Sequence, residues 1–300
     1  MNTEIIKEIN RIFHEEEAKF YDQRHPEIIQ ETNNWINFCE IYLKKMTSPI
    51  IVLDIGTGTG FVPSILTKYL KTEDKIISTD ISQKMLDIAK EKLKNSICRS
   101  EFIKMDSEDL SLFKDSSIDL ITVNSVLHHL PNYPRFLKET DRILKSSGII
   151  CIMHEPNKLF FNNLVLFPFF RLLSALMSKF GKLRKNKNKK EKNSLLLKNV
   201  NQRMVKEKII EREIDIKDIQ PLVDIWSPTA YSKINKNLGF DIAETKKEIF
   251  PDYRLLSLKT YNYLCKINIS HNLFFRSLEK IFSLIFPKSG SSFCLVIQKP

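Results

Sequence analysis

The chain has few cysteines, and their placement argues against two kinds of small protein. Only 5 occur in 300 residues, and no two of them stand in a CxxC spacing. A disulfide framework and a cysteine-rich zinc site both need closer pairs, so we expect neither. The first residues lack the basic head and apolar run of a secretion signal, which predicts a cytoplasmic location. No stretch of about 20 residues is free of charged and amide side chains, so we expect no membrane-spanning helix.

Glycine is also scarce, yet three of the 7 glycines stand in one loop, at Gly56, Gly58 and Gly60. The loop follows an apolar run at 50–53, and such a turn lets the backbone approach a ligand closely. The dinucleotide fingerprint GxGxxG is not met, because Phe61 stands where its last glycine would be. No Gly-Lys-Ser/Thr follows either, which excludes a P-loop.

Apolar strand-like runs alternate with helix-like segments over much of the chain. This rhythm is typical of βαβ units and predicts an α/β fold with a parallel sheet, preceded by an amphipathic helical cap at 1–47. We expect the core to comprise 48–155 and 214–300, with an apolar and basic insertion at 156–213 and a second apolar helical piece at 273–286. The strands are expected at 50–53, 75–79, 101–105, 118–123, 149–153, 240–245 and 293–298, and the helices at 61–70, 82–95, 133–145 and 227–238.

Polar side chains close the predicted strands on one edge of the sheet. Asp54, Asp80, Asp106 and Asn124 end the first four strands, and in an open α/β sheet ligands bind at this edge. A carboxylate at Asp54 suits an ammonium group, one at Asp80 suits ribose hydroxyls, and one at Asp106 suits an exocyclic amine. A ligand with an amino-acid part, a ribose and an adenine is S-adenosylmethionine.

Five stretches carry a family resemblance in order and spacing: IVLDIGTGTGF, IISTDIS, FIKMDSEDL, SIDLITVNSVLHHLPN and ILKSSGIICIMHEP. Together they resemble the class I S-adenosylmethionine-dependent methyltransferases, most of all the small-molecule branch that includes ubiquinone and menaquinone methyltransferases. The resemblance implies a Rossmann-like sheet, and S-adenosylhomocysteine as the product of the cofactor. The residues that it implies for cofactor binding are Tyr21, Asp54, Gly56, Thr57, Gly58, Gly60, Asp80, Ile81, Met105, Asp106, Ser107 and Asn124.

Four residues are candidates for proton transfer. His154 and Glu155 end the fifth predicted strand, where an acceptor would lie. The sequence is equally consistent with a structural role, in which the two side chains only form hydrogen bonds with a backbone amide. His128 and His129 follow the fourth strand. Adjacent helical positions do not share a face, so we expect no metal at this pair, and one histidine to line the acceptor pocket.

The residues after the fourth strand bear on the class of acceptor. Asn124 is followed by Ser125 and Val126 and not by the Pro-Pro-aromatic signature of enzymes that methylate amino groups of nucleic acids, so we expect no sequence-specific nucleic acid. The sequence therefore favours methyl transfer to a small, lipophilic acceptor. The alternatives are an RNA or protein methyltransferase, a catalytically silent partner subunit that binds the cofactor and, more distantly, an NAD-dependent oxidoreductase.

The basic charge is concentrated beside an apolar segment. Residues 182–192 hold seven Lys or Arg against Glu191, a large share of the formal charge of +11. Directly before them, 159–180 is rich in Leu and Phe, which is the composition of a helix lying on an anionic membrane surface. The alternative is that 159–180 and 273–286 pack together as a roof over the cleft, with the basic run as a solvated loop. We therefore expect a cytoplasmic protein. A peripheral location at the inner membrane surface is the second hypothesis.

Overall fold

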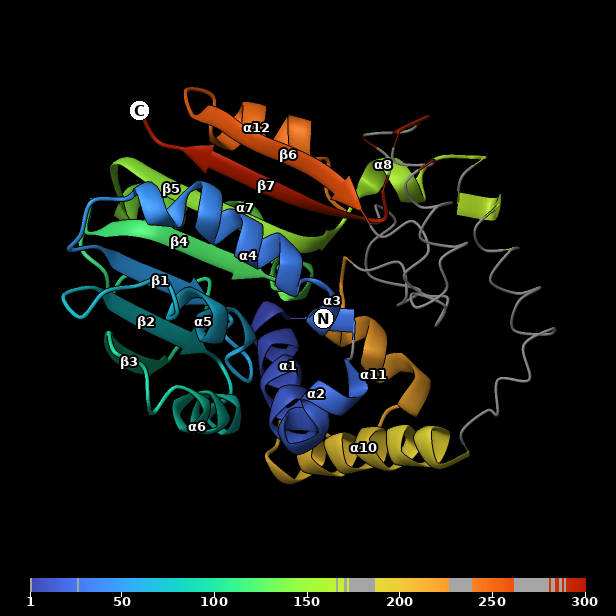
Figure 1. Ribbon diagram of the computed structural model, residues 1–300. Coiled ribbons are helices and arrows are strands. Elements are labelled where there is room, and N and C mark those ends of the chain that lie inside the picture. The colour runs from blue at the N-terminus through green and yellow to red at the C-terminus, as the bar shows by residue number, and fades with distance from the viewer. Residues whose placement is uncertain are drawn as a thin grey trace.

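The computed structural model describes residues 2–25, 27–165, 167–169, 172, 187–226, 239–261, 281, 284–285, 288 and 290–300. Its centre is a seven-stranded sheet in the order β3-β2-β1-β4-β5-β7-β6 (Figure 1). The strands are β1 (Ile51–Ile55), β2 (Lys75–Asp80), β3 (Arg99–Lys104), β4 (Ile118–Asn124), β5 (Leu144–Pro156), β6 (Arg254–Tyr261) and β7 (Ser292–Gln298). The first five strands are parallel, while β7 is antiparallel to both β5 and β6. The strand order reverses between β1 and β4, so a ligand cleft is expected at their carboxyl ends.

Helices cover both faces of the sheet because its central strands are apolar on both sides. Val52 faces the core formed with α4 (Thr32–Ile41) and α5 (Phe61–Leu66). The next residue along the strand, Leu53, faces the core formed with α7 (Tyr133–Ile143) and α12 (Ile242–Ile249). This alternation of side chains along β1 is the strand periodicity that fixes the register of a sheet buried on both faces.

Three helices form a smaller layer beyond the carboxyl edge of the sheet. They are α1 (Thr3–Glu17), α10 (Lys187–Lys206) and α11 (Ile216–Val223), and they share a core that includes Ile9, Phe13, Val200, Met204 and Ile219. We call these three helices the cap. In Figure 1 the cap lies below and to the right of the sheet, and α6 (Gln83–Lys92) lies between its lower part and β3.

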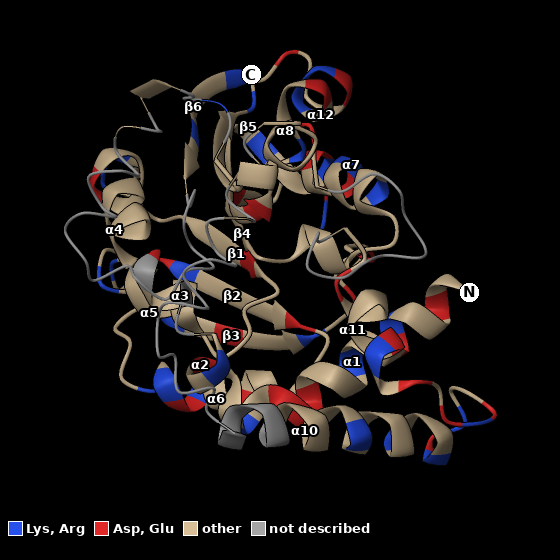
Figure 2. Cartoon of the chain, turned by 90° about the vertical axis from the view of Figure 1, so that its right-hand side faces the viewer, with Lys and Arg blue, Asp and Glu red and all other residues tan. Residues whose placement is uncertain are grey.

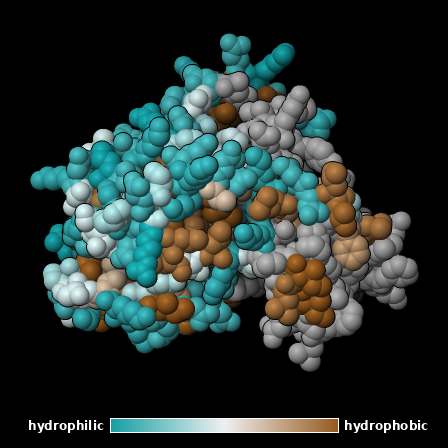
Figure 3. Space-filling view, turned by 90° about the horizontal axis from the view of Figure 1, so that it is seen from above, coloured by the Kyte–Doolittle hydropathy of each residue, from teal (hydrophilic) through white to brown (hydrophobic). Residues whose placement is uncertain are grey.

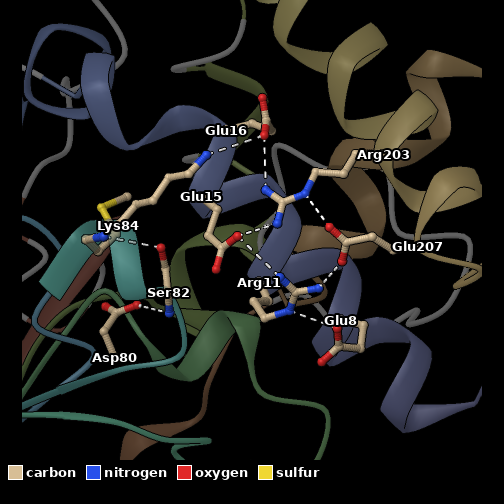
Figure 4. A network of polar contacts seen from close by, with 10 residues as sticks. Glu8, Arg11, Glu15, Glu16, Asp80, Ser82, Lys84, Arg203 and Glu207 are labelled. Atoms are coloured by element: carbon tan, nitrogen blue, oxygen red, sulfur yellow. Dashed lines mark hydrogen bonds and ion pairs between the residues drawn. The ribbon is translucent and has the colours of Figure 1, made fainter. Parts of the chain in front are cut away.

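Ion pairs join the cap helices to one another (Figure 4). Arg203 of α10 contacts Glu15 and Glu16 of α1 at 2.5 and 3.0 Å, while Arg11 of α1 contacts Glu207 at 2.5 Å. Lys84 of α6 lies 3.7 Å from Glu16, which brings the network to the edge of the sheet. The remaining short helices are η1 (Ala18–Phe20), α2 (Tyr21–Arg24), α3 (Glu27–Gln30), η2 (Leu43–Lys45), η3 (Leu127–His129) and α8 (Lys158–Phe161).

The expected α/β fold is confirmed, and within the described residues one predicted strand is wrong. Residues 240–245 are not a strand, because Asp241 accepts a hydrogen bond from the Glu244 amide and caps helix α12. Phe240 makes only an isolated bridge with Asn157. The sequence also missed β6, the edge strand of the sheet.

The expected apolar insertions lie largely outside the described residues. Of 159–180 the structure describes the end of α8 and a few positions beyond it, and of 273–286 only 281, 284 and 285; the helix expected at 227–238 is not described. Among the described residues, no helix has the length and apolarity needed to cross a membrane.

Candidate functional site

A cavity lies at the carboxyl ends of β1, β2 and β4, between the sheet and α1. Figure 2 looks toward this edge of the sheet and shows acidic residues in red at the strand ends. Nine residues expected from the sequence line the cavity: Tyr21, Gly56, Gly58, Asp80, Ile81, Asp106, Ser107, Asn124 and His129. Seven others that were expected do not line it: Asp54, Thr57, Gly60, Met105, His128, His154 and Glu155. The sequence did not single out Lys7, Asn10, His14 and Met85, which also line it, nor Ser125, Val126, Leu130 and Pro131.

The glycine loop is packed so tightly that side chains would not fit at two of its positions. A Cβ atom at Gly56 would lie 2.4 Å from Cγ2 of Val126, and one at Gly60 would lie 3.0 Å from Cβ of Ala89 on α6. Both residues also have a positive φ, of 64° and 82°, which favours glycine. The loop therefore brings backbone, without side chains, to the cavity floor, while Tyr21 stands within 4.0 Å of the place of a Gly58 Cβ atom.

Asp80 ties this loop to the end of β2. Its carboxylate accepts hydrogen bonds from the amides of Gly58 at 2.9 Å and Ser82 at 2.8 Å. Burial raises the pKa of Asp80, although these backbone hydrogen bonds act in the opposite direction. The carboxylate is thus held still at the cavity wall and keeps lone pairs for hydroxyl donors of a ligand.

Asp54 lies beneath the loop and is almost fully buried. One carboxylate oxygen accepts a hydrogen bond from the Thr122 hydroxyl at 2.6 Å, while Oδ2 is buried without a hydrogen-bond partner among the described residues. Burial raises the pKa of Asp54 to about 7. A buried carboxylate oxygen without a donor fits a cationic ligand group nearby, such as the ammonium of an amino acid.

Asp106 follows β3 and is engaged by the cap. Its Oδ1 accepts the amide of Glu108 at 2.9 Å, and its Oδ2 lies 2.7 Å from the Lys7 ammonium. Lys7 also contacts Glu108 at 3.0 Å. Burial would lower the pKa of Lys7, but the hydrogen bonds and charges of the two carboxylates outweigh burial and raise it. The residue expected to bind the adenine amine therefore has a cationic neighbour from α1.

Glu155 holds the turn that connects β4 to the next helix. Its buried carboxylate accepts the backbone amides of Val126 and Leu127 at 2.5 and 2.8 Å and of His128 at 3.2 Å. The same carboxylate lies 2.9 Å from Nδ1 of His128, and the charge of Glu155 outweighs burial and raises the pKa of that imidazole. This arrangement fixes the backbone of η3 and the ring of His128.

His129 faces the cavity from the same turn. Its Nδ1 lies 2.9 Å from the Val223 carbonyl, which can only accept, so Nδ1 carries the proton and Nε2 keeps a lone pair. Burial lowers the pKa of His129 well below its ordinary value, and the neighbouring His128 and His14 act in the same direction. A neutral imidazole with an unprotonated Nε2 can accept a proton.

The premise that the two adjacent histidines do not share a face is contradicted by the structure. Because they stand on a short 3-10 turn, their ring centroids are 4.0 Å apart. One ligand atom from each of His128, His129 and Asp224 lies within 4.8 Å of the others, so spacing alone does not exclude a metal ion.

His154 stands apart from this cluster. Its backbone has a φ of 60°, its amide donates to the Tyr261 hydroxyl at 2.8 Å, and its Nδ1 lies 3.2 Å from Glu31. On the cavity side of this region, Asn124 accepts a hydrogen bond from the Trp35 indole at 3.1 Å.

Comparisons with known proteins agree with this geometry. Residues 53–152 match the family model described as a methyltransferase domain. A demethylmenaquinone methyltransferase of Lactobacillus johnsonii is 29% identical over 137 residues, which cover 45% of this chain and 56% of that protein. A demethylmenaquinone methyltransferase of Lactococcus lactis is 36% identical over 103 residues, which cover 34% of this chain and 40% of that protein. The matched parts thus span roughly half the length of these relatives.

One solved structure shares the fold over nearly the whole chain. It is a SAM-dependent methyltransferase from Archaeoglobus fulgidus, with a TM-score of 0.50, 14% identity, and coverage of 93% of this chain and 100% of that one. The loop backbone at Gly56 and Gly58 and the fixed carboxylate of Asp80 line the cavity, where they fit the amino-acid carboxylate and the ribose of S-adenosylmethionine. Residues 53–152 therefore match a methyltransferase domain, and the chain has the fold of a solved SAM-dependent methyltransferase, so S-adenosylmethionine is the ligand that the cavity is expected to bind.

Proposed function

We propose that the protein transfers a methyl group from S-adenosylmethionine to a small, lipophilic acceptor. The observation that carries this proposal is that the glycine loop and Asp80 line the same cavity as His129, Leu130 and Pro131. Cofactor-binding groups and a proton acceptor beside apolar side chains therefore share one space. Relatives named as demethylmenaquinone methyltransferases support a small, lipophilic acceptor.

In this proposal each strand end has one task. The glycine loop, with Asp54 buried beneath it, holds the amino-acid end of the cofactor, Asp80 the ribose, and Asp106 with Ser107 the adenine. When bound, the cofactor supplies an electrophilic methyl group on a sulfonium sulfur. The protein aligns the acceptor with that methyl group and keeps water out of the cavity.

We assign proton removal to His129. Its Nδ1 proton is held by Val223, so Nε2 is the basic atom, and His129 lines the cavity. Glu155 and His128 act through the turn, which they hold in place by the hydrogen bonds of the Glu155 carboxylate. His154 does not line the cavity, and we assign it no step.

The proposal is tested by binding and turnover together. Isothermal titration with S-adenosylhomocysteine should show one site, and Asp80→Ala should weaken affinity at least tenfold, because hydrogen bonds to charged groups contribute about 1.5–3 kcal/mol each. Asp87→Ala, on the exposed side of α6, is the matched control and should bind like the unchanged protein. Turnover is measured with a reduced, prenylated 1,4-naphthoquinone as the probe acceptor. Failure of the intact protein to bind S-adenosylhomocysteine would contradict the proposal, and binding without turnover would favour the silent-subunit alternative.

We also propose that the protein contacts an anionic membrane surface to reach such an acceptor. Described residues beside α8 are strongly exposed and apolar: Leu164 is 91% and Val165 73% exposed. Leu284, on the second apolar segment, is 81% exposed. Figure 3 shows brown, hydrophobic side chains toward the right of the view. The basic run at 182–192 follows the first of these segments in the sequence. Apolar side chains beside a basic segment are the composition that binds anionic lipid surfaces.

A further inference from the structure

We propose that Asp22 is a positioning residue that fastens a short N-terminal segment over the cofactor site and so sets how fast the cofactor enters and leaves. The segment is 18–25, which comprises η1 and α2, and we call it the gate. The gate carries Tyr21, which lines the cavity. This inference rests on the proposed binding of S-adenosylmethionine and adds a control of its rate.

The ring of Tyr21 covers part of the glycine loop. Its Cε1 atom lies 4.0 Å from the place that a Cβ atom of Gly58 would take, which is van der Waals contact distance. Gly58 also lines the cavity, and its amide donates to Asp80 at 2.9 Å. Because no ligand atom fits between groups at contact distance, a cofactor reaches this face of the loop only when Tyr21, and the gate with it, moves aside.

Three side chains from separate elements fasten the gate to the loop. Asp22 of α2 accepts a hydrogen bond from the Thr59 hydroxyl at 2.6 Å, and its other oxygen lies 3.3 Å from the Lys92 ammonium. Lys92, at the end of α6, also lies 3.4 Å from the Thr59 hydroxyl oxygen. The hydroxyl thus donates to the carboxylate and accepts from the ammonium, as a hydroxyl group can do at once. We call Asp22, Thr59 and Lys92 the latch.

The exposure of the latch favours repeated opening. Thr59 is buried, at 3% exposure, but the side chain of Asp22 is 58% and that of Lys92 34% exposed. Charged pairs that water reaches contribute little to stability, and salt screens them. Separation of Asp22 from Lys92 therefore leaves neither charge buried without a partner, and the rest of the fold is not disturbed.

The other end of the gate has a firmer attachment, at Glu17 of α1. The Glu17 side chain is fully buried, and its Oε1 lies 3.1 Å from the Arg24 guanidinium and 2.8 Å from Nε2 of His25. The His25 ring lies beside Tyr21, with the ring centroids 4.5 Å apart. Loss of the latch therefore leaves the gate attached at Glu17, and the closed position remains the more populated one.

The latch residues themselves do not line the cavity. Loss of the latch removes no contact from the bound ligand and only raises the fraction of time for which the gate is open. Since entry and release both need the open gate, both rate constants should rise by the same factor, while their ratio, the dissociation constant, stays the same. A residue that binds the cofactor behaves differently, because its loss accelerates release and weakens affinity together.

The test measures association and dissociation of S-adenosylhomocysteine by stopped flow, and affinity by calorimetry. Asp22→Ala should raise both rate constants about tenfold, the factor that one hydrogen bond to a charged group contributes to an equilibrium, and leave the dissociation constant unchanged. Lys92→Met should raise both about threefold, as expected for an exposed ion pair. Added salt should accelerate release from the intact protein but not from Lys92→Met, because salt screens the pair that this variant lacks.

Gln23→Ala and Lys90→Met are the matched controls, because both residues are exposed, on α2 and α6, and neither belongs to the latch. Both should keep the rates of the intact protein, and chemical denaturation shows whether each variant is folded. Unchanged rates in Asp22→Ala would overturn the proposal. Faster release with an equal loss of affinity would also overturn it, because Asp22 would then belong to the binding site. If the intact protein does not bind S-adenosylhomocysteine, the cofactor assignment is wrong as well, whereas normal binding with unchanged rates overturns the gate alone.

Discussion

Two aspartates end neighbouring strands of the sheet, and their carboxylates have different partners. Asp80 accepts two backbone amides, whereas Asp54 accepts one hydroxyl and leaves Oδ2 without a donor among the described residues. An ionised carboxylate is costly in such a site unless a cation is present. Asp54 is therefore the residue whose protonation should respond most to the ammonium group of the cofactor.

Cofactor binding should release a proton from Asp54. Because burial raises the pKa of Asp54 to about 7 in the folded protein, its stabilising contribution is complete below about pH 4 and is lost as pH rises through about 7. A bound ammonium favours the ionised form, so affinity for S-adenosylhomocysteine should rise about tenfold per pH unit up to about pH 7 and then level off. Calorimetry in buffers of different ionisation enthalpy measures the released proton directly.

Asp54→Asn is the informative variant for this linkage. It should bind the ligand more weakly at pH 8 and lose the pH dependence, because no carboxylate remains to ionise. Asp87→Asn, on the exposed face of α6, should keep the full dependence. A pH dependence that survives in Asp54→Asn would assign the proton to another group, of which Asp80 is the nearest candidate, since burial raises its pKa too.

Residues at strand ends were predictable, whereas those that α1 contributes were not. The pattern of an apolar run followed by an acid predicts a carboxylate at the sheet edge, and Asp80 and Asp106 are indeed found lining the cavity there. Lys7 and His14 stand on the polar side of an amphipathic helix, a position that usually faces solvent. Only the packing of α1 against α10 and α11, which involves residues more than 180 positions away, turns them toward the cavity.

At the scale of elements, α12 shows how a local signal can be misread. Phe240, Ile242 and Ala243 form a short apolar cluster of the kind found in strands, but Asp241 and Glu244 have the spacing of a capping box. The side chain of Asp241 accepts a hydrogen bond from the Glu244 amide, and this N-terminal capping interaction determines that a helix forms. The capping residues were present in the sequence, and their effect outweighs that of the three apolar residues.

The stability of the three-helix cap formed by α1, α10 and α11 should depend on Arg203. Its guanidinium contacts Glu15, Glu16 and Glu207, with distances of 2.5, 3.0 and 2.5 Å, and joins α10 to α1. Arg203→Met keeps most of the length of the side chain but removes one cation from these partly buried carboxylates, which leaves Arg11 beside Glu15 and Glu207 and Lys84 near Glu16. We expect the free energy of unfolding to fall by about 1–3 kcal/mol. S-adenosylhomocysteine should also dissociate several times faster, because α1 covers the cavity.

Chemical denaturation and stopped-flow release of S-adenosylhomocysteine measure the two effects. Arg212→Met is the matched control, since Arg212 is exposed in the segment after α10. A loss of stability without faster release would mean that α1 closes the cavity independently of α10.

At the scale of the whole molecule, the sheet order brings the ends of four strands to one edge, where the α1 helix meets them. This part follows from βαβ connections, whose handedness and adjacency leave few alternatives. The pairing of β6 with β7 at the far edge did not follow from the sequence, because an edge strand has partners on one side only and a weaker pattern. The apolar segments at 159–180 and 273–286 are the parts of the sequence that bear most directly on whether the protein contacts a membrane.

The membrane proposal predicts two separable components of lipid binding. Each basic residue near an anionic surface contributes about 1 kcal/mol, and salt screens this contribution, whereas burial of apolar side chains is not weakened by salt. The protein should therefore sediment with phosphatidylglycerol-containing liposomes at low salt, more weakly with phosphatidylcholine alone, and partly remain bound as salt rises. Changing Lys187, Lys189 and Lys190 to Gln should weaken the salt-sensitive part by about 3 kcal/mol, or roughly a hundredfold.

The control for these substitutions removes the same charge elsewhere. Lys44, Lys94 and Lys217 are all exposed, and changing them to Gln lowers the net charge equally without touching the basic run. If both triple variants lose binding alike, the attraction is a general effect of the formal charge of +11 and not of the run at 182–192. If the intact protein does not sediment with anionic liposomes at low salt, the exposed Leu164 and Val165 do not contact a membrane. The acceptor must then reach the cavity from aqueous solution.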